Sequence, residues 1–214
     1  MHPVLALGLA YLAGSFPSAY LTGRALKGVD LRTMGSGNLG ATNVYRHLGA
    51  GAAAGVLLID ALKGALPAAL LPGLLPASAV AAPHAVLGWG LAFGVAAIAG
   101  HAKPIFLLWK GGGKGVATAA GVFAVLAPIG FGVALAAFLL TLWRTGIMSL
   151  AAIVASLVLP VVLALTAGVG SILFVVGLAV SAFVVWSHRE NIARLRQGTE
   201  PRTFRGPHKA GDTA

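Results

Sequence analysis

The chain has 214 residues, of which 58% are hydrophobic and only 9% are charged, and its mean hydropathy is +0.91. This composition excludes a soluble globular domain and indicates an integral membrane protein. The chain carries a net charge of +10 and has no cysteine, which excludes disulfides, thiolate metal sites and a cysteine nucleophile.

Charges and Pro or Gly breaks divide the chain into hydrophobic segments, which predict an all-α membrane protein with about seven transmembrane helices. In chain order the segments are 4–23, 52–71, 85–108, 116–127, 129–143, 147–165 and 171–186. The fourth and fifth segments are short and meet at Pro128, so they could instead form one kinked helix and leave six crossings. We expect residues 1–200 to form a single polytopic membrane domain and residues 201–214 a basic, flexible cytoplasmic tail.

The basic residues favour seven crossings, with the N-terminus outside and the C-terminus in the cytoplasm. With this topology Lys63 alone, of the 15 Lys and Arg residues, lies outside the cytoplasmic loops and ends. The outer connections, near 72–83, at 128 and near 166–170, carry no Lys or Arg. Six crossings would place the basic tail outside. With seven crossings, by contrast, three polar blocks at residues 36–46, 110–118 and 188–200 lie on the same cytoplasmic face, where they can converge.

The first polar block is SGNLGATNVYR, residues 36–46. Glycine lets the backbone approach a ligand closely, and the exposed N–H groups at the start of a helix can bind an anion. Arg46 adds a guanidinium, which grips phosphate with two parallel hydrogen bonds. The alternative is an ordinary glycine-rich turn before a capped helix. The candidate ligands here are Ser36, Gly37, Asn38, Gly40, Thr42, Asn43 and Arg46.

The second block is KGGGKGVAT, residues 110–118, which runs directly into an apolar helix. It is not a nucleotide-binding P-loop, because Gly115 follows Lys114 where that motif requires Ser or Thr. The partial positive charge of the helix N-terminus and the Lys114 ammonium would both attract phosphate. The alternative is an anchor for lipid headgroups. The candidates are Gly111, Gly112, Gly113, Lys114, Gly115 and Thr118, with His101 upstream as a substrate ligand or a structural histidine.

The third block is HRENIARLRQGTE, residues 188–200, in which His188, Asn191 and Arg194 recur every three residues on one helical face. Neutral His188 could accept a proton, and protonated His188 could bind phosphate. Glu200 closes the block as a further candidate. The alternative is a solvated basic helix at the membrane surface.

Asp60 and Lys63 form an i, i+3 pair within the second hydrophobic segment. Charges in a transmembrane segment are expensive and are usually paired or functional. We expect the two to pair with each other, either as a structural pair or with Lys63 also contacting substrate.

In this order and orientation the three blocks closely resemble the motifs of the acyl-phosphate-dependent glycerol-3-phosphate acyltransferases of bacterial membranes, the PlsY family. The resemblance covers nearly the whole chain. GSGNLGATN with Arg46 is similar to the first family motif, Gly100 and His101 through GGKGVAT to the second, and HRENI with Arg194 and Glu200 to the third. The stretch 101–114 is one residue longer than is usual, with Gly111 as an additional glycine.

The resemblance implies an enzyme of the bacterial cytoplasmic (inner) membrane, with its active site on the cytoplasmic face. It would transfer a fatty acyl group from acyl phosphate to the 1-hydroxyl of sn-glycerol 3-phosphate, in the first step of phospholipid synthesis. The products are lysophosphatidic acid and phosphate. No cofactor, metal or nucleic acid is implied, whereas membrane lipids and the soluble enzyme that makes acyl phosphate are implied partners. The residues that the resemblance implies as catalytic are Ser36, Arg46, Lys114, His188 and Asn191.

The residues leave two alternatives open, one for the acceptor of the hydroxyl proton and one for the function. The proton of the attacking hydroxyl could go to His188 or to the substrate's own phosphate, whereas a covalent acyl-Ser36 lacks an activating base in the sequence. The alternative function is a phosphate-ester transporter, but the halves of the chain show no internal repeat. Acyl-CoA is not the expected donor, because the chain has no H-x-x-x-x-D motif.

Overall fold

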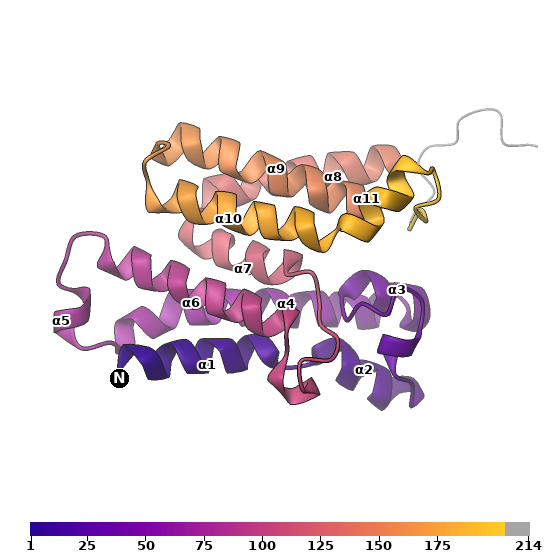
Figure 1. The fold of residues 1–214 in the computed structure, drawn as a ribbon, viewed down its shortest axis with the longest axis horizontal. Helices are drawn as coiled ribbons and strands as arrows, with labels where there is room; N and C mark the ends of the chain where they lie inside the picture. The colour runs from indigo at the N-terminus through magenta and orange to yellow at the C-terminus, as the bar shows by residue number, and fades with distance from the viewer. Residues whose placement is uncertain (204–214) are drawn as a thin grey trace, which may run out of the picture. The chain divides into compact units, whose positions relative to one another are not determined.

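The computed structural model describes residues 1–203, which contain helices and no strand (Figure 1). The chain divides into two compact units, residues 1–128 and the residues from 129 onward. The first unit contains α1 (Pro3–Ser15), α2 (Ser18–Lys27), η1 (Leu31–Thr33), α3 (Ala41–Leu48), α4 (Ala50–Leu70), η2 (Leu71–Leu74), α5 (Ala77–Val80), α6 (Ala85–Ala102), η3 (Ile105–Leu107) and α7 (Val116–Leu126). The second contains α8 (Pro128–Thr145), α9 (Met148–Ala167), α10 (Ile172–Ser187) and α11 (Arg189–Arg196).

All seven predicted hydrophobic segments are helical. Five spans among the described residues are long and apolar enough to cross a membrane, and α10 with α11 adds a sixth if this pair, bent by 59°, is counted as one span. The first span is broken between α1 and α2 at Phe16 and Pro17. The apolar helix α7 has 11 residues and ends at Ala127, whose φ of −148° leaves the helical region before α8 begins. The fourth and fifth predicted segments are therefore separate helices.

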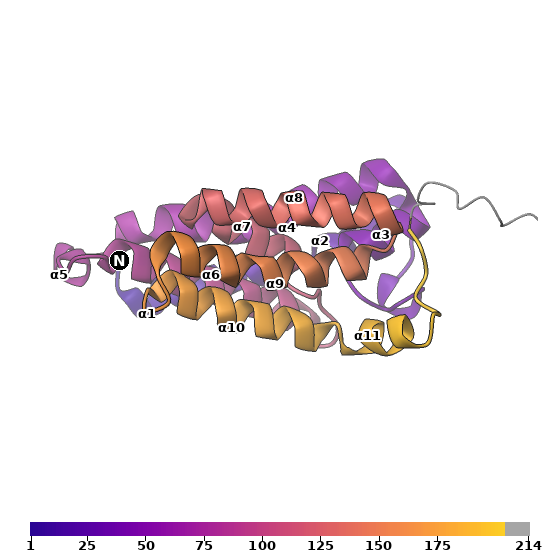
Figure 2. The same ribbon diagram turned by 90° about the horizontal axis from the view of Figure 1, so that it is seen from above.

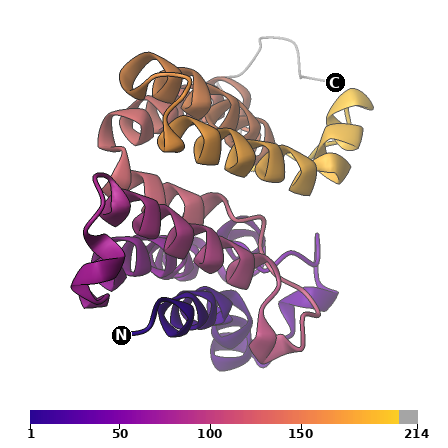
Figure 3. The same ribbon diagram turned by 60° about the vertical axis from the view of Figure 1, so that its left-hand side comes forward.

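Glycines bring two pairs of helices in the first unit into backbone contact. A Cβ atom at Gly14 of α1 would overlap the carbonyl oxygen of Ala97 on α6, and one at Gly100 of α6 would overlap that of Tyr11 on α1. These two helices lie side by side (Figure 1, Figure 3). In the same way, Gly64 of α4 lies directly against the backbone of Thr118 on α7. Small residues at such contacts are typical of helices packed in a membrane.

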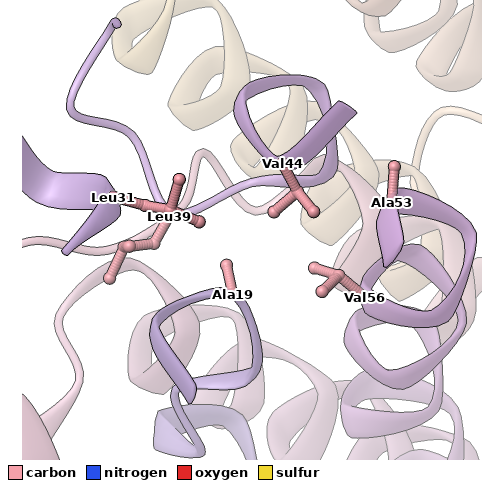
Figure 4. Close-up of a cluster of buried hydrophobic side chains, with 6 residues drawn as sticks. All are labelled: Ala19, Leu31, Leu39, Val44, Ala53 and Val56. Atoms are coloured by element: carbon pink, nitrogen blue, oxygen red, sulfur yellow. The ribbon is translucent and has the colours of Figure 1, made fainter. Parts of the chain in front are cut away.

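A hydrophobic cluster fixes one end of the first unit. Its side chains converge from α2, η1, the following loop, α3 and α4 (Figure 4). The loop between η1 and α3 carries the first polar block, so this cluster attaches that block to the helix bundle. The members of the cluster are Ala19, Leu31, Leu39, Val44, Ala53 and Val56.

The second unit is built from α8, α9 and α10, which run alongside one another in Figure 2. Gly130 of α8 faces Leu163 of α9, and Ser181 of α10 donates a hydrogen bond to the Ser156 carbonyl of α9. After α11 the chain returns toward the turn between α8 and α9, where the Thr203 amide donates to the Gly146 carbonyl at 2.7 Å. Of the basic tail predicted at 201–214, all but the first three residues lie outside the described part.

Replacing Gly64 by alanine tests the contact between α4 and α7. The new Cβ would overlap the carbonyl oxygen of Thr118, a backbone atom that cannot move aside without shifting α7. We expect a loss of about 1–3 kcal/mol in the free energy of unfolding, measured as a lower thermal midpoint in detergent. Gly55→Ala on the same helix is the matched control, because nothing lies within 4 Å of its Cβ position. Equal midpoints for the two variants would contradict this account of the packing.

Candidate active site

The first and second polar blocks meet in the first unit. The Leu39 amide of the first block donates a hydrogen bond to the Gly112 carbonyl of the second at 3.1 Å. Leu39 is buried, and it is also part of the hydrophobic cluster that attaches the first block to α2, α3 and α4. Two glycine-rich segments more than 60 residues apart in sequence are therefore held against each other by backbone and core contacts.

The Asn43 side chain holds the loop of the first block by hydrogen bonds. This side chain is buried, and Nδ2 donates to the carbonyls of Leu31 at 3.2 Å and Met34 at 3.1 Å. Its Oδ1 accepts the Ser36 amide at 3.4 Å. Asn43, which the sequence places among the ligands, thus uses its amide to hold the loop. Ser36 and Arg46 are exposed, and Gly37, Asn38, Gly40 and Thr42 are partly exposed.

The second block lies tightly against the end of α6. The Gly113 amide donates to the His101 carbonyl at 3.0 Å. A Cβ at Gly113 would overlap the His101 ring, and one at Gly112 would overlap the Ala102 carbonyl, so only glycine fits at these two positions. The loop then turns into α7 at Gly115, which has a φ of +79°, a left-handed conformation that favours glycine. Lys114 is half-buried beside this turn.

Thr118 lies one turn inside α7, away from the loop surface. It is fully buried at the contact with α4, and within residues 1–203 its Oγ1 has no hydrogen-bond partner. Thr118 therefore lies just after the glycine loop, at the point where α7 packs against α4.

A small cleft opens beside the second block. Its empty volume is about 210 Å³, a value that includes open solvent at the mouth of the cleft. Lys63 and His101 lie on its lining, both mostly buried. Most of the other lining residues are apolar or glycine, and no carboxylate is among the described residues that line the cleft. The lining residues that matter for the site are Phe16, Ser18, Lys63, His101, Gly112 and Gly113.

Lys63 is held in this cleft by Asp60 and Ser18. Its Nζ lies 2.5 Å from Asp60 Oδ1 and 2.9 Å from Ser18 Oγ, and Ser18 Oγ donates to the same carboxylate oxygen at 2.6 Å. His101 Nδ1 lies 3.8 Å from that oxygen. The expected pairing of Asp60 with Lys63 is confirmed. An ammonium has three N–H donors, and in the described structure two of them go to these partners, while the centre of the Phe16 ring lies 5.8 Å from Nζ.

Ser18, Phe16 and Pro17 line the cleft but were not singled out from the sequence. The sequence feature that indicates this part of the cleft is Pro17 inside a long hydrophobic segment. Proline removes a backbone hydrogen bond and breaks a helix. The break between α1 and α2 at this proline places Ser18 at the start of α2, where its hydroxyl reaches Asp60.

The third block forms its own hydrogen-bonded arrangement in the second unit. His188 lies at the bend between α10 and α11, is buried, and has Nδ1 at 2.8 Å from the Val184 carbonyl. A carbonyl only accepts, so Nδ1 carries the proton and Nε2 is the acceptor of the neutral ring. Asn191 is buried one turn later.

Glu200 organises this block. Its carboxylate accepts hydrogen bonds from Ser149 at 2.7 Å, Asn191 at 2.5 Å and Arg194 Nε at 2.6 Å. Burial alone would raise the pKa of Glu200, but the bonds from Ser149, Asn191 and Arg194 outweigh it and hold the pKa below its ordinary value. Glu200, expected as a substrate ligand, is thus engaged by three protein donors and positions Asn191 and Arg194.

These features define a class of protein: an all-helical membrane protein with joined glycine loops, exposed basic side chains and a cationic cleft, which suits substrates that carry phosphate. Comparison with known proteins narrows the class. Residues 4–198 match the family model described as glycerol-3-phosphate acyltransferase.

Relatives named glycerol-3-phosphate acyltransferase match most of the chain. One from Prochlorococcus marinus is 42% identical over 203 residues, covering 93% of this chain and 97% of the relative. One from Geotalea daltonii is 46% identical over 197 residues, covering 92% of this chain and 95% of the relative. The crystal structure of PlsY (YgiH), an integral membrane glycerol 3-phosphate acyltransferase, in its glycerol 3-phosphate form is similar with a TM-score of 0.81, 34% identity and 94% of each chain covered. The chain belongs to the glycerol-3-phosphate acyltransferase family.

The buried pair of Asp60 and Lys63 provides a test of the cleft. Asp60→Asn leaves Lys63 without its counter-charge, and removing one partner of a buried pair costs on the order of 3–5 kcal/mol. We expect the double variant Asp60→Leu with Lys63→Met to recover much of the thermal midpoint, but not acyltransferase activity, because it also removes the ammonium that lines the cleft. Recovery of both the midpoint and the activity in the double variant would reduce the pair to a structural role.

A second test concerns the ionisation of Glu200. Because folding lowers its pKa, the stability it contributes is complete above the ordinary value of 4.5 and is lost as the pH falls toward the lower, folded-state value. We expect wild-type protein to have a higher thermal midpoint than Glu200→Gln above pH 4.5, and the difference to shrink below it. A difference that stayed constant as the pH fell would show that the charge of Glu200 contributes nothing.

Proposed function

We propose that this protein transfers a fatty acyl group from acyl phosphate to the 1-hydroxyl of sn-glycerol 3-phosphate and releases lysophosphatidic acid and phosphate. The observation that carries the proposal is the joining of two glycine-rich blocks at Leu39 and Gly112, beside a cleft lined by Lys63. Both substrates carry phosphate, so the reaction needs two anion sites close together. Related PlsY structures are described as glycerol 3-phosphate and lysophosphatidic acid forms, which correspond to the acceptor and the product.

The donor phosphate is assigned to the second block. Gly112 and Gly113 keep the loop backbone free of side chains, and Lys114 lies beside the N-terminus of α7. When the hydroxyl oxygen attacks the carbonyl carbon, the bond from that carbon to the phosphate oxygen breaks and its electron pair leaves with the phosphate. Lys114 and the helix N-terminus stabilise the charge that develops there. Thr118, buried where α7 packs against α4, is the remaining residue of this assignment.

The acceptor is assigned to Ser36 and Arg46 in the first block and to His188 and Asn191 in the third. Its hydroxyl proton has two candidate acceptors, His188 Nε2 and the substrate's own phosphate. A phosphate monoester has a second pKa of about 6, so it can take up a proton near neutral pH. If the phosphate accepts the proton, the protein contributes mainly position and charge, whereas His188 would act as a general base.

We further propose seven crossings, with the N-terminus outside, the C-terminus in the cytoplasm and the active site on the cytoplasmic face of the bacterial inner membrane. Charge within the first unit supports this orientation. The end with Met1 and residues 71–84 has no Lys or Arg, whereas the end with the glycine blocks carries seven (Figure 1). These are Arg24, Lys27, Arg32, Arg46, Lys103, Lys110 and Lys114.

We retain residues 1–200 as one acyltransferase domain, because the family match at residues 4–198 includes residues of both compact units. Membrane lipids and the soluble enzyme that makes acyl phosphate are the proposed partners. The membership of an acyltransferase family argues against the phosphate-ester transporter considered from the sequence.

The direct experiment mixes detergent-purified protein with labelled glycerol 3-phosphate and either palmitoyl phosphate or palmitoyl-CoA. We expect labelled lysophosphatidic acid and released phosphate with palmitoyl phosphate alone. Product from palmitoyl-CoA instead would overturn the donor assignment. A folded protein that makes no product, yet carries labelled glycerol 3-phosphate into vesicles, would be a transporter.

Arg46→Lys tests the acceptor assignment. Lysine keeps the positive charge but loses the paired N–H donors that bind phosphate bidentately. We expect the KM for glycerol 3-phosphate to rise roughly tenfold, with the KM for palmitoyl phosphate little changed. Arg144→Lys is the control, since the Arg144 guanidinium stacks on the Trp143 ring, outside the three polar blocks. An unchanged KM for glycerol 3-phosphate in Arg46→Lys would count against the assignment.

A further inference from the structure

Arg32 lies in η1, just before the first polar block, and is held rigidly by Asp30. Its Nε lies 3.0 and 3.2 Å from the two carboxylate oxygens of Asp30, and its Nη2 lies 2.7 Å from Oδ2. The Arg32 backbone amide also donates to Asp30 Oδ1 at 3.0 Å. A guanidinium bound by a carboxylate through both nitrogens of one edge, Nε and Nη2, is held in a defined orientation.

The same guanidinium reaches the second block. Its Nη1 donates to the Lys110 carbonyl at 3.3 Å. Its aliphatic stem covers the next residue, because a Cβ at Gly111 would lie only 2.9 Å from Arg32 Cδ. Gly111 has a φ of +92°, a conformation that side chains rarely adopt. Gly111 is therefore the residue over which Arg32 lies.

Hydrogen bonds thus hold the glycine loop on both sides of Gly111. Arg32 binds the carbonyl of Lys110 on one side, and the Leu39 amide binds that of Gly112 at 3.1 Å on the other. Both hydrogen-bond donors, Arg32 and Leu39, belong to the segment that leads into and forms the first block. Motion of this segment would be transmitted directly to the loop.

We propose that Arg32 is a positioning residue that fixes residues 110–113, so that the glycine loop presents its backbone to the phosphate of the acyl donor. The identity of the acyl donor rests on the function proposed above, whereas the hydrogen bonds that hold the loop do not depend on it. Arg32 acts through Lys110 and Gly111 rather than by touching substrate, since its guanidinium is already occupied by Asp30 and the Lys110 carbonyl.

Arginine is needed here for its shape as well as its charge. The planar guanidinium bonds Asp30 with one pair of nitrogens while Nη1 points to Lys110, whereas a lysine ammonium is a point charge that cannot hold this geometry. The Arg32 hydrogen bond lowers the pKa of Asp30 to about 2, so the ion pair remains intact over the whole range in which the enzyme would be assayed.

Arg24 is a matched control. It shares the Asp30 carboxylate with Arg32, at 3.7 Å, and its guanidinium lies 5.4 Å from the centre of the Tyr20 ring, on which Arg32 also stacks at 5.0 Å. Its hydrogen bonds go to Tyr20 and Gly28, at the end of α2, rather than to the glycine loop.

The test compares Arg32→Gln, Arg32→Lys and Arg24→Gln in the full-length protein. Two quantities are measured: hydrogen exchange of the backbone amides in 108–118, without substrate, and steady-state kinetics with palmitoyl phosphate and glycerol 3-phosphate. We expect both Arg32 variants to exchange faster at 110–113 and to raise the KM for palmitoyl phosphate about tenfold, with kcat and the KM for glycerol 3-phosphate within about twofold of wild type. Arg24→Gln should change neither quantity.

Three results would overturn the proposal. Wild-type exchange and KM in Arg32→Lys would mean that charge alone suffices. Faster exchange throughout α4 and α6 in Arg32→Gln would mean a general loss of stability. An equal effect in Arg24→Gln would assign the role to the cluster around Asp30. If the wild-type enzyme made no product but the Arg32 variants still loosened 110–113 selectively, the proposed function would fail while the positioning role stood.

Discussion

Backbone contact at glycine positions is the constraint from which the site in the first unit is built. Gly14 and Gly100 press α1 against α6, which sets the position of the last residues of α6. His101 and Ala102 then leave room only for glycine at 112 and 113, and the Gly112 carbonyl binds the Leu39 amide of the first block. A side chain added at Gly14, Gly100, Gly112 or Gly113 would overlap a neighbouring backbone or ring atom.

Electrostatics add a second constraint, because a largely apolar bundle tolerates buried charge only where it is compensated. Asp60 and Lys63 are 1% and 7% exposed, and Ser18 bonds both of them. Replacing such a pair by apolar residues is often neutral or stabilising, so packing alone does not explain its presence. Lys63 lies on the lining of a cleft beside the glycine loop, and we propose that the reason for the pair is functional, with the held ammonium attracting phosphate.

The sequence predicted the helical segments well, because long apolar runs in this chain have few alternatives to a membrane helix. It also located all three polar blocks and the pairing of Asp60 with Lys63. What it did not predict is the direction in which polar side chains point. Asn43 and Glu200 share the composition of their blocks with exposed neighbours, yet both turn inward and hold protein groups. Ser18 was missed because its role depends on a contact with Asp60, 42 residues away.

We propose that the first and second blocks bind the two substrate phosphates at adjacent sites. The most direct measurement is hydrogen exchange of the wild-type protein in detergent, with and without glycerol 3-phosphate and a non-transferable acyl phosphonate. The account predicts that the two ligands together slow exchange in both 35–46 and 110–118, while exchange in α5 at the opposite end of the first unit stays unchanged. Slowing in only one of the two blocks, or in neither, would contradict it.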